Sequence, residues 1–126
     1  MTDKERAIRG TEVRQKLGMD TEASKHRFDT IDPEFSGQVD EYLNNACFGD
    51  VWARPGLDLR TRRLLTIAML AALGRERQLR GHIAGALQQG ISREEVLETI
   101  VHVSPYAGFP AGLTALEIFR EATKGG

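Results

Sequence analysis

The sequence has little of several residue types, and each shortage excludes a class of protein. Its single cysteine, Cys47, cannot form an internal disulfide, a CxxC redox pair or a cysteine-rich zinc site. With 17 Lys and Arg against 18 Asp and Glu, the net charge of -1 argues against a nucleic-acid partner or a polybasic membrane contact. The longest apolar run, residues 64–73, is about half of the ~20 residues that a membrane span needs. The polar first residues show no secretory signal. We therefore expect a cytoplasmic protein.

What is present indicates a globular helical chain. The 126 residues are 40% hydrophobic, which suits a single domain over residues 1–126. No segment shows the alternation of a strand, whereas apolar residues recur at helical spacing. The sequence therefore predicts an all-α fold of about six helices: 2–17, 33 to about 46, 59–73, 75–89, 93 to about 104, and 110 onward.

Local signals set the expected boundaries. Asp32 and Pro33 suit an N-cap and a first turn, and Ser92 with Glu95 forms a capping box. We expect loops at 20–31, which includes His26, and a connector at 49–56.

The apolar patterns predict which faces are buried. The segment 59–73 has no polar face after residue 63, so we expect it to be buried all round, partly against a second subunit. In the fifth helix we expect an apolar side, with an interruption at Pro105 and Gly108. Its apolar residues are Val96, Ile100 and Val103. The apolar points of the last helix are Leu113, Leu116 and Phe119.

One stripe of polar residues could carry chemistry. Gln78 and Arg75 precede His82 by four and seven residues, so the three share one helical face. A cation, an amide and a titratable imidazole together could form a site, but a solvated face has the same pattern.

Two further pairs are ambiguous. His102 and Tyr106 could share a helical face, either as a hydrogen-bonded core pair or as part of a site. Trp52 and Arg54 could line the edge of a pocket or anchor the structure. The histidines lack metal-ligand spacing, and neither a nucleophile elbow nor a dinucleotide or phosphate-binding loop occurs. We expect neither a metal nor a cofactor.

The residues also resemble a known family. The stretch WARPGLDLRTR at 52–62, the helix of His82, and HVSPYAGFPA at 102–111 are similar to the carboxymuconolactone decarboxylase family. The similarity runs from about residue 3 to 122. It implies an alkylhydroperoxidase D-like helical fold and a homotrimer or a homohexamer.

Departures from the peroxidase branch of this family change the expected chemistry. Arg75 and Gln78 stand where that branch has two cysteines, and Arg63 stands where it has a glutamate. A thiol peroxidase is thereby excluded. The added arginines suit an anion, and Arg54, Arg63 and Arg75 are candidates for binding it, because guanidinium groups bind carboxylates in a fork.

The resemblance implies decarboxylation of an anionic lactone in aromatic (protocatechuate) catabolism, without a cofactor, to the β-ketoadipate enol-lactone. Loss of carbon dioxide leaves an electron pair that the conjugated lactone carbonyl accepts, so the protein supplies oxyanion donors and a proton. We expect His82 to be the general acid because histidine titrates near neutral pH, with His102 and Tyr106 as alternatives. Gln78, His102 or Tyr106 could donate to the oxyanion.

Two alternatives remain. One is a decarboxylase or isomerase of the same fold that acts on another lactone or keto acid. The other is a helical assembly protein without catalysis.

Overall fold

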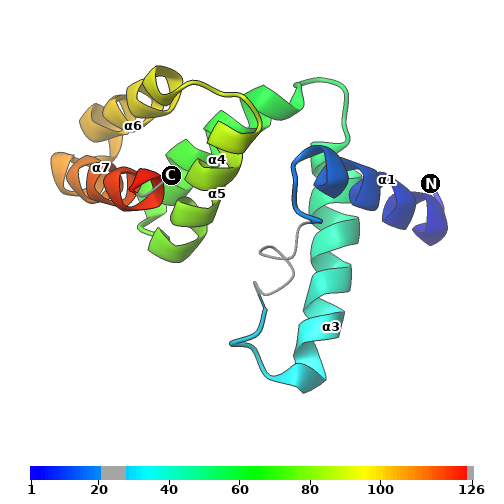
Figure 1. Ribbon diagram of the computed structural model, residues 1–126. Helices are drawn as coiled ribbons and strands as arrows, with labels where there is room; N and C mark the ends of the chain where they lie inside the picture. Colours follow the sequence, from blue (N-terminus) through cyan, green and yellow to red (C-terminus); the bar gives the residue numbers. More distant parts are fainter. Residues whose placement is uncertain (21–27, 125–126) are drawn as a thin grey trace. The chain divides into compact units, whose positions relative to one another are not determined.

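The computed structural model describes residues 1–20 and 28–124 and divides the chain into two compact units, residues 1–57 and 58–126 (Figure 1). In the described residues six α-helices and one π-helix are present and no strand occurs, so the all-α prediction is confirmed. His26 and most of the loop expected at 20–31 lie outside the described residues. No helix among the described residues is long and apolar enough to span a membrane.

The first unit begins with α1 (Asp3–Lys16), which follows the capping box of Thr2 and Glu5. The helix α3 (Pro33–Tyr42) starts as expected, with the Asp32 carboxylate accepting from the Glu34 amide. It continues directly into the π-helix η1 (Leu43–Trp52).

The expected connector at 49–56 is therefore wrong over its first half, since the helix runs through residue 52. The helical hydrogen bonding continues to the end of η1, where the Ala53 amide donates to the Phe48 carbonyl, five residues back, at 3.0 Å. Pro55 and Gly56, which do disfavour a helix, lie beyond this point.

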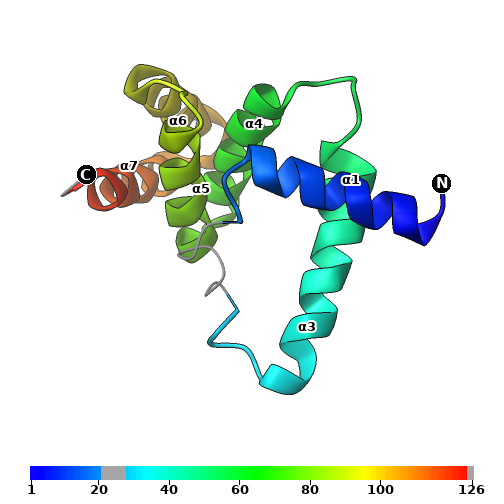
Figure 2. The same cartoon turned by 45° about the vertical axis from the view of Figure 1, so that its right-hand side comes forward.

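The helix α1 crosses η1 closely within the first unit (Figure 2). The close approach requires glycine, because a Cβ on Gly10 would collide with the backbone carbonyl of Asn44 and one on Gly49 with the carbonyl of Arg6. Arg6 also makes a two-point ion pair with Asp50, with both nitrogen–oxygen distances at 2.8 Å. The close backbone contact and the ion pair together stabilise the packing of α1 against η1.

The second unit contains four α-helices: α4 (Leu59–Leu73), α5 (Glu76–Gln88), α6 (Arg93–Ala107) and α7 (Phe109–Thr123). The Asp58 carboxylate accepts from the Thr61 amide at the start of α4, and Gly74 ends that helix at φ 72°. A Ser92–Glu95 capping box starts α6, as expected. The helix α4 packs against each of the other three helices of this unit, α5, α6 and α7. That core includes Ile67, Leu79, Ile83, Val96, Ile100 and Phe119.

Within one chain α4 leaves Leu65, Met69 and Leu73 exposed. Burial of this face against a second subunit therefore stays a prediction. Two other expectations for the second unit are wrong. Pro105 does not interrupt α6, since it lies inside the helix three residues from its C-cap, Gly108. In α7, Leu113 is exposed and Ile118 is buried, because the close contact of Gly112 with Ser104 sets which face of α7 meets α6.

Candidate active site

A buried arginine and a histidine meet between α4 and α5. The Arg63 side chain, in the second turn of α4, is 2% exposed, and its Nη1 lies 2.8 Å from Nδ1 of His82 on α5. A guanidinium group has only donors, so Nδ1 must be the acceptor in this hydrogen bond. The imidazole is then neutral and carries its proton on Nε2.

Two more residues of the α5 segment contact the same guanidinium. Nε of Arg63 donates to Oε1 of Gln89 at 3.2 Å. Gly85 lies so close that a Cβ built on it would be 2.9 Å from both Nη atoms. Sequence reasoning missed both residues, although their offsets of three and seven from His82 place them on its helical face.

Burial and charge set the protonation of the pair. Burial and, secondly, the charge of Arg63 lower the pKa of His82 from 6.5 to about 4. Burial lowers the pKa of Arg63 to about 10, which leaves its guanidinium charged at pH 7. The expectation that His82 titrates near neutral pH therefore fails for the site without substrate. A fixed cation and a neutral N–H donor lie side by side there.

The other two residues of the predicted α5 stripe do not join this buried pair. Arg75 is exposed at the N-cap of α5, where its backbone carbonyl accepts from the Leu79 amide. Gln78 is also exposed. Of the three arginines predicted to bind an anion, Arg63 is buried, whereas Arg75 and Arg54 are exposed.

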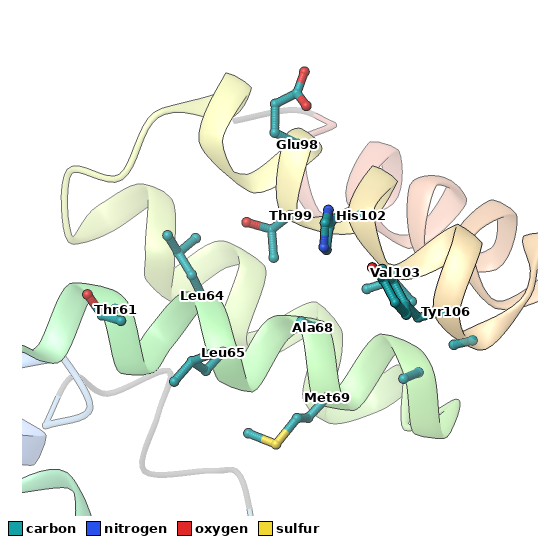
Figure 3. Close-up of a pocket in the computed structure, with 12 residues that line it drawn as sticks. Thr61, Leu64, Leu65, Ala68, Met69, Glu98, Thr99, His102, Val103 and Tyr106 are labelled. Atoms are coloured by element: carbon teal, nitrogen blue, oxygen red, sulfur yellow. The ribbon is translucent and has the colours of Figure 1, made fainter. Parts of the chain in front are cut away.

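His102 and Tyr106 lie in a different place, a groove between α4 and α6 with a volume of about 810 Å³ (Figure 3). Their rings are 5.4 Å apart, and Tyr106 is 84% exposed, so this is not a buried core pair. The groove is mainly apolar, and neither Arg63 nor His82 lines it. The structure therefore does not place His102 and Tyr106 in one pocket with the buried pair.

Trp52 and Arg54 belong to the first unit. The Trp52 side chain is 7% exposed and packs against Phe48, with ring centroids 5.5 Å apart, as a structural anchor would. Arg54 is exposed. A role for either in substrate binding stays a prediction.

No group of three or more His, Cys, Asp or Glu in the described part of the chain could hold a metal ion. The Arg63–His82 pair itself offers a guanidinium charge and an imidazole.

In this all-α protein a buried guanidinium and a half-buried, neutral imidazole lie side by side between two helices, which makes them a candidate site for an anion. The chain belongs to the carboxymuconolactone decarboxylase family, whose model matches residues 37–121.

Similar proteins include decarboxylases. The chain is 36% identical to a 4-carboxymuconolactone decarboxylase of Acinetobacter baylyi, over 98% of this chain and 91% of that protein. It is 32% identical to a nitrosuccinic acid decarboxylase of Metarhizium robertsii, over 69% of this chain and 61% of that protein. An uncharacterized 15.0 kDa protein of Paracoccus denitrificans is 44% identical over 56% of this chain and 54% of its own.

Proposed function

We propose that the protein is a carboxy-lyase that removes carbon dioxide from 4-carboxymuconolactone without a cofactor and forms the β-ketoadipate enol-lactone. The observation that carries this proposal is the buried Arg63–His82 pair, in a chain similar over 98% of its length to a decarboxylase of that name. A cytoplasmic location stays a prediction from the single cysteine.

The charge of the site suits such a substrate. The lactone carries a ring carboxylate and an acetate arm, so it is a dianion near neutral pH. Among the described residues at the buried site, Arg63 supplies a full positive charge and His82 a neutral donor. Charge-assisted hydrogen bonds of this kind are roughly twice as strong as neutral ones.

The electron flow determines where these donors act best. When the ring carboxylate leaves as carbon dioxide, its bonding pair passes through the conjugated double bond to the lactone carbonyl and forms a dienolate. A cation at the departing carboxylate would stabilise the substrate more than the transition state, because that charge moves away. Donors at the carbonyl oxygen gain strength as the reaction proceeds. We therefore place Arg63 and His82 at the carbonyl oxygen.

His82 also supplies the proton in this proposal. The negative charges of the bound dianion raise the pKa of His82, opposite to the effects of burial and Arg63. As the substrate binds, Nδ1 takes up a proton from solvent and gives up the hydrogen bond from Arg63. The imidazolium then donates its Nε2 proton to the ring carbon next to the carbonyl, which completes the enol-lactone, leaves one carboxylate on the product and returns His82 to its neutral form.

The test is consumption of the lactone, followed by its ultraviolet absorbance together with release of carbon dioxide. His82→Gln should lower kcat by about 10²–10³, the usual loss for an oxyanion donor. Arg63→Met, which keeps an unbranched apolar stem, should lose at least as much, because it removes the only charge of the pair. Exposed Arg77 offers a matched control, and Arg77→Met should retain native turnover.

Binding of the lactone without turnover by the native protein would contradict the proposal and favour an assembly role. The similarity to the nitrosuccinic acid decarboxylase favours a second candidate, decarboxylation of another compound with two carboxylates. Release of carbon dioxide from nitrosuccinate but not from the lactone would select that candidate.

We also propose that the chain works as a homo-oligomer, a trimer or a hexamer. The support is the exposed apolar surface of the second unit, to which Leu65, Met69 and Leu73 of α4 contribute. A solvent-exposed apolar face of this kind is typical of a subunit interface. Sedimentation equilibrium should give three or six times the 14.0 kDa chain mass, and a monomer would contradict the proposal.

A further inference from the structure

The guanidinium of Arg63 is held from the side of α5 by residues that are not themselves candidates for touching the substrate. We propose that Gly85 and Gln89 are positioning residues, which fix Arg63 against His82 and so keep the imidazole proton on Nε2. The consequence for catalysis rests on the function proposed above, but the positioning itself does not.

Gly85 leaves room for the guanidinium group of Arg63, because it has no side chain. It lies three residues after His82, on the same face of α5, and its backbone faces the flat guanidinium group. An added Cβ would lie 2.9 Å from Nη1, 2.9 Å from Nη2 and 3.0 Å from Cζ. Real Cβ atoms essentially never come within 3.0 Å of another heavy atom. Any side chain at this position must displace the guanidinium that contacts His82.

Gln89 orients the guanidinium group of Arg63. Its Oε1 accepts from Nε of Arg63 at 3.2 Å, while Nη1 donates to His82 at 2.8 Å. Two hydrogen bonds from different nitrogens of one planar group fix both its position and its rotation. The bare backbone at Gly85 lets the group lie in this orientation.

The tautomer follows from this arrangement. With the guanidinium in place, protonation of Nδ1 would set two donors against each other, so the proton stays on Nε2. Without it, both tautomers of a neutral imidazole become accessible. Among the described residues, Arg63 is the charged side chain whose field adds to burial in lowering the pKa of His82. Displacing it should therefore also raise that pKa.

The chain offers a matched pair of substitutions to test this. Gly85→Ala and Gly81→Ala add the same methyl group to the same helix, four residues apart. A Cβ at Gly81 meets nothing within 4 Å, whereas one at Gly85 meets the guanidinium. In the same way, Gln89→Ala removes the acceptor, and Gln88→Ala removes an exposed neighbouring amide.

The readout is nitrogen-15 NMR of the His82 ring in the full chain without substrate, titrated with pH. We expect the native protein and both control variants to show unprotonated Nδ1 at pH 7. Gly85→Ala and Gln89→Ala should show a mixture of tautomers, and the pKa of His82 should rise, because the guanidinium charge moves away from the ring. A native spectrum and titration in both test variants would overturn the proposal. If Gly85→Ala does not fold, Gln89→Ala decides alone.

This experiment is independent of turnover. Mixed tautomers in the two test variants, together with a native protein that fails to consume the lactone, would refute the proposed function and leave the positioning role standing. Native tautomers in the test variants of an active enzyme would refute the positioning role alone. In an active enzyme we expect Gly85→Ala to lower kcat far more than Gly81→Ala does.

Discussion

Acid should destabilise the protein through His82 at a pH where most carboxylates still carry their charge. The pKa of His82 falls from 6.5 in the unfolded chain to about 4 in the folded one, through burial and the charge of Arg63. Between these values the unfolded state binds more protons than the folded state. Stability is therefore fully present above pH 6.5 and is lost as the pH falls toward 4.

The size of the effect follows from the shift. A difference of roughly 2.5 pKa units corresponds to about 3 kcal/mol, of which about 2 kcal/mol is lost between pH 7 and pH 5. Two carboxylates outside this site, Asp50 in η1 and Asp58 at the N-cap of α4, act at lower pH. Hydrogen bonding to Arg6 and to Thr61 lowers the pKa values of Asp50 and Asp58, respectively, from 3.8. Their contributions are present above that value and are lost only as the pH falls through the lower, folded-state pKa values.

Urea unfolding followed by circular dichroism at several pH values between 7 and 5 measures this loss. His82→Gln is the control, because its amide can still accept from Arg63 but does not titrate. The free energy of unfolding of the native protein should fall by about 2 kcal/mol more than that of the variant. Parallel pH dependences for the two proteins would refute the conclusion that the folded state holds a neutral, buried imidazole.

Two further predictions concern packing and helix capping. Gly10→Ala should destabilise the first unit by about 2 kcal/mol or more, because its Cβ would meet the Asn44 carbonyl. Gly37→Ala is the control, because a Cβ there meets nothing within 4 Å. Equal urea midpoints for the two variants would contradict this prediction. Ser92→Ala should cost about 1 kcal/mol through loss of the capping box with Glu95, measured by thermal unfolding, and an unchanged Tm would show that the cap contributes nothing.

Helix starts could be predicted from the sequence because their signals are local. Asp32, Asp58 and Ser92 each accept a hydrogen bond from a backbone amide within three residues, so a few neighbouring letters contain all the information. The extension of helical structure through residue 52 could not be predicted in this way. It is accompanied by the contact of Gly49 with α1, about 40 residues earlier in the chain.

The candidate site could be predicted in part. Pattern reasoning found His82, and the family resemblance drew attention to Arg63. Neither identified the depressed pKa of His82, which depends on how deeply α4 and α5 bury the pair. Gln89 and Gly85 were missed because an amide and a glycine acquire a role only from a guanidinium supplied by another helix.

The buried position of Trp52 has a practical consequence. It is the single tryptophan of the chain, so its emission spectrum reports on the first unit, whereas the His82 resonances report on the second. One denaturation series observed with both probes would measure the cooperativity between the two units. Coincident transitions are the signature of all-or-none unfolding, and separate midpoints would reveal an intermediate with one unit intact.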